Sequence, residues 1–393
     1  MELLDNPVRG YAWGSYTTIA QLQGRPAPTE RPEAELWLGA HPDGSSTVEV
    51  SSGPVSLKDL IGADPDRLLG APVVARFGAR LPFLMKVLAA AQPLSLQAHP
   101  DAAQAAAGYA AEQAAGALPG SPVRNYHDPY HKPELLVAVD DFDALCGFRD
   151  PGASAELLDR LKVPALASTV QALRTAVGPE AALRTAVTGL LSLDQGSRGP
   201  LVQAVVDAAG ALDTPADALV AELGARYPGD IGVVLALLLN QVRLAPGEAV
   251  WLPAGNLHAY LRGAGVEIMA ASDNVLRGGL TPKHVDVAEL LRVLRFEVLA
   301  DPVVRPQPVA PGLVTWRTLA DEFVLHRATL GGGYPERVEL PGHGPRIVLC
   351  LTGEVLVDDG ASTVRLHGGQ AGFGRAGRTG TVSGQGVVFQ ATC

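Results

Sequence analysis

The 393-residue sequence has no excess of positive charge, since its formal net charge is −10 and its pI is near 5.4. No stripe of lysine and arginine runs along it, so we expect no nucleic-acid partner. It also lacks an apolar run of about 18 residues, so no membrane span is predicted. The segment 1–15 has no basic start followed by an apolar stretch, which argues against a secretory signal.

Cysteine and aromatic residues are scarce. The three cysteines, Cys146, Cys350 and Cys393, are odd in number and are not spaced like metal ligands. A reducing cytoplasmic setting is therefore expected. Aromatic residues make up 5% of the chain, whereas glycine occurs 44 times and proline 31 times. This composition favours short strands and many turns over an all-helical fold.

The composition changes along the chain. Residues 1–149 consist mostly of strand-like runs and turns, with a helix predicted over 101–118. Residues 150–245 are rich in alanine and leucine at spacings of three and four, which predicts helices, and they carry no functional motif. Strands resume over 246–310, with one helix predicted over 281–296. Residues 311–393 have many short strands punctuated by glycine. We therefore predict a mainly β protein with an α-helical insertion.

Two segments carry side chains that could bind a metal. In LSLQAH, the period of two places Gln97 and His99 on one face of a strand, and the flanking leucines and prolines favour a half-buried face over a solvated one. The segment HDPYHKPELL (127–136) offers His127, His131 and Glu134 as possible ligands and is held extended by two prolines. A polar surface loop is the alternative interpretation of this second segment.

A third segment, GEAVWLPAGNLHAYL (247–261), fits the second signature of the cupin barrels, G–x5–P–x–G–x2–H. The residues in register are Gly247, Pro253, Gly255 and His258. Proline and glycine form the turn, and the histidine then points into the barrel. Two features depart from the pattern: Arg262 stands where an asparagine is usual, and the first signature is distorted, with Gln97–x–His99 in place of paired histidines and Glu134 far downstream.

Together these segments offer two imidazoles, one carboxylate and one amide oxygen. The residues are Gln97, His99, Glu134 and His258. Such ligands suit Zn²⁺ with an open position for substrate. They also suit Fe²⁺, for which two histidines and a carboxylate form the facial triad, so the ligand types leave the metal open.

The chain resembles type I mannose-6-phosphate isomerases along nearly its full length. The matching segments are YAWGS (11–15), AELWLGAHPDGSS (34–46), LPFLMKVLAAAQPLSLQAHPD (81–101), YHKPELLVAV (130–139), LPAGNLHAYL (252–261) and GVEIMAASDNVLRGGLTPKHVDV (265–287). The resemblance implies a cupin or jelly-roll catalytic domain from 1–149 and 246–310, a helical domain over 150–245, and a second, degenerate cupin-like domain over 311–393.

The resemblance also implies one Zn²⁺ per chain, held by Gln97, His99, Glu134 and His258, and an essential arginine at Arg277. The implied activity is the reversible isomerisation of D-mannose 6-phosphate and D-fructose 6-phosphate through a metal-stabilised enediol. This reaction serves mannose metabolism and supplies mannose 6-phosphate for GDP-mannose synthesis. The expected protein is a cytoplasmic monomer or weak homodimer whose partner is a phosphorylated sugar.

Moving a proton between two carbons requires a base and a group that stabilises the enediolate. We assign Arg277 to the enediolate or the substrate anion, although an ion pair with Asp273 is the competing role. Glu267 follows His258 at a separation that a hairpin could turn back toward the metal, and we favour it as the general base. The alternative for Glu267 is a buried partner for an arginine.

Lysine is rare in this arginine-rich chain, and the five lysines are Lys58, Lys86, Lys132, Lys162 and Lys283. Because Lys86 and Lys132 flank ligand segments, we expect them to bind substrate or move a proton. For Lys283 we expect a solvated position, and for Trp37 a place in the core. The remaining predicted substrate-binding residues are Trp13, Glu35, His131 and Asp273.

Two rival functions fit part of the pattern. An iron-dependent cupin oxygenase would use the same ligands, but it would leave the basic cluster of Arg277 and the lysines without a purpose. A non-catalytic sugar-binding cupin would hold a purely structural metal. Metal content and oxygen consumption separate the first rival from an isomerase.

Overall fold

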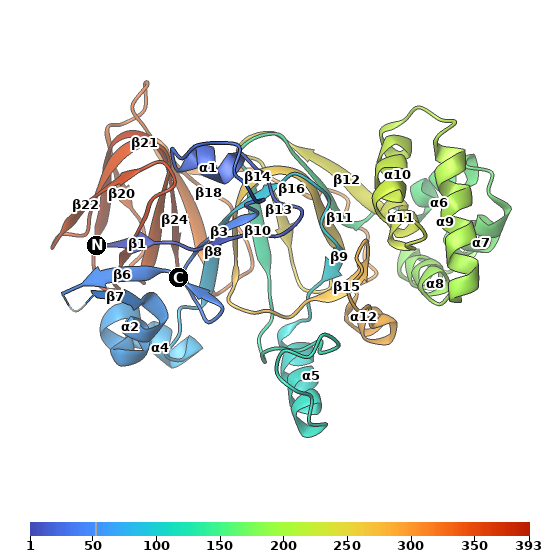
Figure 1. Ribbon diagram of the computed structural model, residues 1–393, viewed down its shortest axis with the longest axis horizontal. Coiled ribbons are helices and arrows are strands. Elements are labelled where there is room, and N and C mark those ends of the chain that lie inside the picture. Colours follow the sequence, from blue (N-terminus) through green and yellow to red (C-terminus); the bar gives the residue numbers. More distant parts are fainter. Residues whose placement is uncertain (52) are drawn as a thin grey trace.

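The computed structural model describes residues 1–51 and 53–393. Figure 1 shows an elongated molecule in which the C-terminal strands form one end, a second β unit occupies the middle, and a group of helices forms the other end. The fold is the mainly β architecture with a helical insertion that the composition predicts. None of the helices in the described part of the chain is both long and apolar enough to cross a membrane.

The middle unit is a large antiparallel sheet. Its main path runs β16 (Val303–Val304), β13 (Ala249–Leu252), β10 (Glu134–Ala138), β14 (His258–Ala270), β8 (Phe83–Ala90), β3 (Glu35–Leu38) and β2 (Val8–Arg9). Strands β9 (Leu96–Ala98), β11 (Phe142–Phe148), β12 (Leu239–Leu244) and β15 (Leu276–Gly279) join beside this path. The long strand β14 pairs with β8, β9, β10 and β11, so it connects the segments that carry the candidate ligands.

The second sheet takes strands from both ends of the chain. Its C-terminal strands are β17 (Gln307–Ala310), β18 (Leu313–Thr315), β19 (Val324–Leu330), β20 (Arg337–Leu340), β21 (Arg346–Asp358), β22 (Thr363–His367), β23 (Ala371–Gly374) and β24 (Gly380–Thr392). Strands β1 (Glu2–Asp5), β6 (Thr47–Val50) and β7 (Gly53–Ser56) extend it, because β1 pairs with β23. The N-terminal segment therefore contributes to both sheets, and the division into domains at 149, 245 and 310 stays a prediction.

The helical insertion comprises α6 (Pro151–Arg160), α7 (Ala167–Thr175), α8 (Pro179–Leu191), α9 (Gln195–Ala209), α10 (Pro215–Arg226) and α11 (Gly232–Leu235). The prediction of helix over the end of this block was wrong for Leu239–Leu244, which forms β12. The cause is long-range: β12 pairs with β11, and its buried side chains are Leu239, Val242 and Leu244.

The other predicted helices are present but shorter. Helix α5 (Ala102–Ala114) starts at a capping box in which Asp101 accepts from the Gln104 backbone and the Gln104 side chain accepts from the Asp101 backbone. Helix α12 (Val287–Val293) starts only after Asp286, which caps it. Short helices α1 (Thr18–Leu22), α2 (Leu57–Ala63), α3 (Pro65–Leu69) and α4 (Ala71–Phe77) and the small β4 (Ala40–His41) and β5 (Gly44–Ser45) ladder complete the N-terminal region.

One hydrophobic cluster crosses the boundary between the two β units. Val87 and Ile268 of the middle sheet pack in the same cluster as Trp316, Phe323 and Phe389 of the C-terminal unit. The indole nitrogen of Trp316 donates to the carbonyl of Gly247 at 3.1 Å. The C-terminal unit is therefore packed against the back of the sheet that carries the candidate site.

Gly255 shapes the turn between β13 and β14. Its φ of +78° lies in the left-handed region, and an added Cβ would approach the Arg295 nitrogen and the Val293 oxygen to 3.0 Å. The backbone N–H of Gly255 donates to the carbonyl of His99 at 2.8 Å. The turn therefore fixes the start of β14, where His258 stands, relative to His99.

We expect Gly255→Ala to lower the free energy of unfolding by about 3 kcal/mol, because strain at positive φ adds to crowding against the backbone. Gly24→Ala is the matched control, since Gly24 has a φ of +64° but no atom within 4 Å of an added Cβ. This control should lose about 1 kcal/mol. Urea denaturation measures both values, and equal losses would contradict the crowding argument.

Candidate active site

Three buried side chains from different strands converge. His99 follows β9, while Glu134 and His258 are the first residues of β10 and β14. The Oε2 atom of Glu134 lies 3.3 Å from Nε2 of His99 and 3.4 Å from Nε2 of His258. All three residues are at most 2% exposed. The strand pairing of β14 with β9 and β10 thus brings together ligands that are far apart in the sequence.

The converging atoms have no hydrogen-bond partner among the described residues. These atoms are Nε2 of His99, Oε2 of Glu134 and Nε2 of His258. The other ring nitrogens already have partners. Nδ1 of His99 donates to the backbone carbonyl of Asn274 at 2.7 Å, and Nδ1 of His258 donates to the backbone carbonyl of Asn256 at 3.0 Å.

Because a carbonyl can only accept, each histidine carries its proton on Nδ1 and presents the lone pair of Nε2. Three buried acceptors that face one point are unfavourable unless a cation lies among them. The residues present therefore fit a metal ion with nitrogen and oxygen ligands.

Gln97 and Lys132 lie next to this cluster. Gln97 of β9 is opposite His258 of β14 and Arg277 of β15 in the strand register. The Nζ atom of Lys132 lies 3.0 Å from Oε1 of Glu134. Burial alone would raise the pKa of Glu134, but Lys132 and His99 hold it well below its usual value. Glu134 is thus an anion, as a metal ligand must be.

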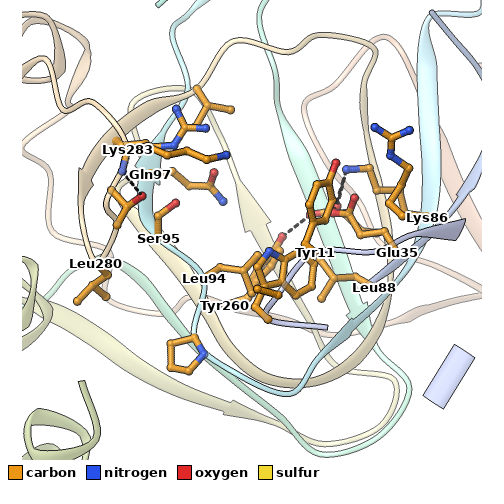
Figure 2. Close-up of a pocket in the computed structure, with 18 of the residues that line it drawn as sticks. Tyr11, Glu35, Lys86, Leu88, Leu94, Ser95, Gln97, Tyr260, Leu280 and Lys283 are labelled. Carbon is orange, nitrogen blue, oxygen red and sulfur yellow. Dashed lines mark hydrogen bonds and ion pairs between the residues drawn. The ribbon is translucent and has the colours of Figure 1, made fainter. Parts of the chain in front are cut away.

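The cluster opens into a cavity of about 560 Å³. Figure 2 shows Ser95, Gln97 and Lys283 on one side of it and Tyr11, Glu35 and Lys86 on the other. The candidate site residues that border the cavity are Trp13, Glu35, Lys86, Gln97, Lys132, Glu134, Glu267, Asp273 and Arg277. Its size suits a small metabolite.

At one end of the cavity, acids and a lysine form a buried network. Nζ of Lys86 lies 3.3 Å from Oε1 of Glu35 and 3.7 Å from Oε2 of Glu267. The Tyr260 hydroxyl donates to Oε1 of Glu267 at 2.8 Å. Trp37 is buried, as expected, but it also donates from its indole nitrogen to Oε2 of Glu35 at 2.7 Å and borders the cavity.

The charges of this network determine its protonation. Burial alone would lower the pKa of Lys86, but Glu35 and Glu267 raise it above its usual value. Burial and the nearby charge of Glu134 raise the pKa of Glu267 to about 7. At neutral pH, Lys86 is therefore a cation, while Glu267 is present in both its ionised and its protonated form. A carboxyl with this pKa suits proton transfer.

At the other end, Arg277 and Lys283 border the cavity without an ion-pair partner in the described part of the chain. Burial lowers the pKa of both, and Arg277 lowers that of Lys283 further. Lys283 is exposed, as expected, yet sequence reasoning missed its place beside the cavity. The alternative ion pair of Arg277 with Asp273 is wrong, because Oδ2 of Asp273 instead lies 3.1 Å from Nε2 of His41.

A second group of potential ligands consists of His41, Asp43 and Asp273. Both ring nitrogens of His41 are already used: Nδ1 accepts from the Asp43 backbone at 3.2 Å, and Nε2 donates to Asp273. In contrast to the first cluster, this group leaves no histidine lone pair free. Its geometry therefore gives a weaker case for a metal.

Two further residues differ from the sequence prediction. His131 does not border the cavity; its ring bonds to Glu322 in the C-terminal unit, so the prediction that it contacts substrate has no support in the geometry. Tyr227 of the helical insertion does border the cavity, and its hydroxyl donates to the Pro93 carbonyl at 2.9 Å. No local motif marks Tyr227, because only the packing of helices on the sheet brings it there.

Comparison with known proteins agrees with this geometry. A sequence model of the type I phosphomannose isomerase catalytic domain matches residues 1–151. The mannose-6-phosphate isomerase of Escherichia coli (strain K12) is 38% identical over 383 residues, which cover 95% of this chain and 94% of that protein. The enzyme of Schizosaccharomyces pombe is 32% identical over 428 residues and covers 98% of both chains.

Solved structures give the same result. A zinc-bound mannose 6-phosphate isomerase has a TM-score of 0.91 at 34% identity and covers 100% of this chain and 98% of its own. A point mutant of phosphomannose isomerase from Salmonella typhimurium has a TM-score of 0.93 at 34% identity, with coverage of 100% and 99%.

The fold and the converging ligands define a metal-binding protein of the cupin class, with its site at the ends of β9, β10 and β14. The cavity beside the site carries acids at one end and cations at the other. With the relatives added, the chain belongs to the type I phosphomannose isomerase family.

Proposed function

We propose that this protein is a zinc-dependent isomerase that interconverts D-mannose 6-phosphate and D-fructose 6-phosphate. The observation that carries the proposal is the convergence of three ligand atoms without hydrogen-bond partners beside a cavity whose two cations, Arg277 and Lys283, have no ion-pair partner among the described residues. An oxygenase would need the same ligands but would have no use for those cations. The relatives, which bear the name of the isomerase, also favour this function over the oxygenase and the binding-module alternatives.

One Zn²⁺ per chain would be held by His99, Glu134 and His258, with the amide oxygen of Gln97 as the fourth ligand. Nitrogen and oxygen donors of this kind leave a position open for substrate in catalytic zinc sites. When bound, the ion would polarise the substrate's carbonyl or the neighbouring hydroxyl. The Asn274 and Asn256 carbonyls hold the two rings in the tautomer that this role requires.

We predict that the protein binds one Zn²⁺ per chain. His258→Ala should weaken this binding at least about 100-fold, because the loss of a direct ligand costs more affinity than the loss of a residue that only orients a ligand. His41→Ala is the control, because His41 belongs to the other ligand group and should leave zinc affinity unchanged. Competition with a chromogenic chelator measures both affinities. A loss of zinc affinity in His41→Ala, with none in His258→Ala, would place the metal at the group of His41, Asp43 and Asp273 and contradict the proposed site.

Glu267 is the proposed general base. In its ionised form it would take the proton from C2 of mannose 6-phosphate and return it to C1, while the carbonyl moves from C1 to C2. Its pKa of about 7 and its contact with Tyr260 support this role. Lys86 keeps a positive charge beside Glu267, and Lys132, next to Glu134, is the proposed group that moves the hydroxyl proton from O2 to O1 of the substrate.

Arg277 and Lys283 are the proposed site for the phosphate group. Both are cations without an acidic partner in the described residues, and two such groups side by side repel each other unless an anion lies between them. Arg277 is also opposite Gln97 in the strand register, so the proposed phosphate site adjoins a proposed metal ligand. A sugar phosphate bound in this way would direct its carbonyl end toward Glu267.

Further substrate contacts, the cellular compartment and the assembly complete the proposal. Trp13, Glu35 and Asp273 border it and are proposed to contact the sugar hydroxyls. The three cysteines are free, in keeping with the cytoplasm as the proposed setting and mannose metabolism as the proposed role. We keep a monomer or weak homodimer as the proposed assembly.

Isomerase activity is the first test of the function. The purified protein should convert mannose 6-phosphate to fructose 6-phosphate, lose this activity after dialysis against a chelator, and regain it when Zn²⁺ is added back. A coupled assay for fructose 6-phosphate follows the rate. A folded, zinc-loaded protein that does not turn over mannose 6-phosphate would rule out the proposed substrate.

The phosphate site has its own test. Lys283→Met should raise KM for mannose 6-phosphate about tenfold and change kcat little, because a charge-assisted contact to a non-reacting group is lost. Lys162→Met is the matched control, since the Lys162 side chain is 77% exposed and lies in the helical insertion. An unchanged KM in Lys283→Met would exclude this residue from phosphate binding.

A further inference from the structure

The loop over 127–133 leads into β10 and includes Lys132, whose ammonium group contacts Glu134. Asn274 fixes its first half, because Nδ2 of Asn274 donates to the carbonyls of Asp128 and Tyr130 at 2.8 Å. The carbonyl of Pro133 accepts from the Ala270 N–H at 3.1 Å, which fixes its end. Between these two points, His131 and Lys132 make no backbone hydrogen bond to any residue that the structure describes.

The side chain of His131 provides the missing anchor. Its Nε2–H donates to Oε1 of Glu322 at 2.6 Å. Glu322 lies between β18 and β19 in the C-terminal unit and is 8% exposed. Hydrogen bonds to an ionised carboxylate are roughly twice as strong as neutral ones. The C-terminal unit thus holds the middle of a loop that belongs to the cavity of the other β unit.

Lys132 is the residue that this anchor controls. It follows His131 directly, is 9% exposed, and its Nζ lies 3.0 Å from Oε1 of Glu134. We propose that Glu322 is a positioning residue that acts through His131 to keep Lys132 on Glu134 and in the cavity. This inference rests on the proposed function of Lys132. Through Glu322, the C-terminal unit would affect the reaction although its own strands do not line the cavity.

A simpler role for Glu322 would be to join the two β units. The neighbouring residue Asp321 serves as the comparison, because it forms an ion pair with Arg76 of α4. Both side chains of that pair are more than half exposed, and neither contacts the loop over 127–133 through a hydrogen bond or ion pair in the described part of the chain. Asp321 therefore ties the same segment of the C-terminal unit to α4 without reaching Lys132.

The test compares Glu322→Ala, Glu322→Gln and His131→Ala with the control Asp321→Ala, all as full-length, zinc-loaded protein. Glu322→Ala should lower kcat for mannose 6-phosphate about 10- to 100-fold and leave KM within about twofold, because misplacing a catalytic group affects the chemical step. Glu322→Gln keeps an acceptor for His131 and should retain more activity than Glu322→Ala. Asp321→Ala should match the wild type.

The pair should also act as one unit. The double variant His131→Ala/Glu322→Ala should be no slower than the slower single variant, because either change alone already breaks the contact. Fully additive losses, in contrast, would show two independent effects and overturn the proposal.

A second measurement does not depend on turnover. Acetylation of lysines by an N-hydroxysuccinimide ester, read by peptide mass spectrometry, reports the accessibility of Lys132 against the exposed Lys162 in the same sample. Loss of the anchor should speed labelling of Lys132 about tenfold in Glu322→Ala and leave it unchanged in Asp321→Ala. If Glu322→Ala does not fold, Glu322→Gln and His131→Ala decide the question.

The outcomes separate the inference from the proposed function. A wild type that does not isomerise mannose 6-phosphate contradicts the function, and the labelling of Lys132 still decides whether Glu322 holds the loop. In an active protein, an unchanged kcat in folded Glu322→Ala overturns the inference. Equal effects of Glu322→Ala and Asp321→Ala on kcat or labelling overturn it too, because they indicate a general loosening of the segment around 321–322 and not the anchoring of His131.

Discussion

Two histidine lone pairs and a carboxylate face one another in the interior of this protein, and the surrounding structure is arranged to keep them there. Such acceptors repel each other and, in isolation, would each turn toward a donor or water. Strand pairing prevents this, because β14 pairs with β9 at His258 and with β10 farther along its length. The carbonyls of Asn274 and Asn256 fix the rings, and Gly255 ties the turn before His258 to the backbone of His99. This arrangement is favourable only when a cation completes it.

The charged side chains around the ligands make the two ends of the cavity electrostatically different. At one end, Lys86 is enclosed by Glu35 and Glu267, so positive and negative charge nearly balance. At the other end, Arg277 and Lys283 have no acidic partner among the described residues. A local positive end on a chain with a net charge of −10 suits an anionic group of a small substrate. The ligand residues adjoin both ends, because Gln97 is opposite Arg277 in the strand register and the charge of Glu134 acts on Glu267.

Local sequence patterns predicted much of this site. The period of two in Gln97–x–His99 and the turn signature before His258 follow from strand and turn geometry, and the structure brings His99, Glu134 and His258 together. Family membership and the mainly β fold are confirmed by the relatives and the solved structures. The fourth ligand and the roles of individual residues stay predictions, because they depend on a bound metal and substrate.

Long-range packing explains what the sequence could not predict. Strand β12 looks helical by its apolar spacing, but pairing with β11 decides its structure. Tyr227 reaches the cavity only because the helices dock on the sheet, and His131 turns away from it toward Glu322 of a distant segment. Local spacing carries no information about such contacts. The same limit applies to β1, β6 and β7, which join the C-terminal sheet.

We expect a single zinc ion to complete the buried ligand cluster. Anomalous diffraction from crystals of the zinc-loaded protein, recorded on both sides of the zinc absorption edge, tests it most directly. We predict one strong anomalous peak per chain among Nε2 of His99, Nε2 of His258 and the carboxylate of Glu134. An absent peak at this point, or a peak beside His41, Asp43 and Asp273 instead, would contradict it.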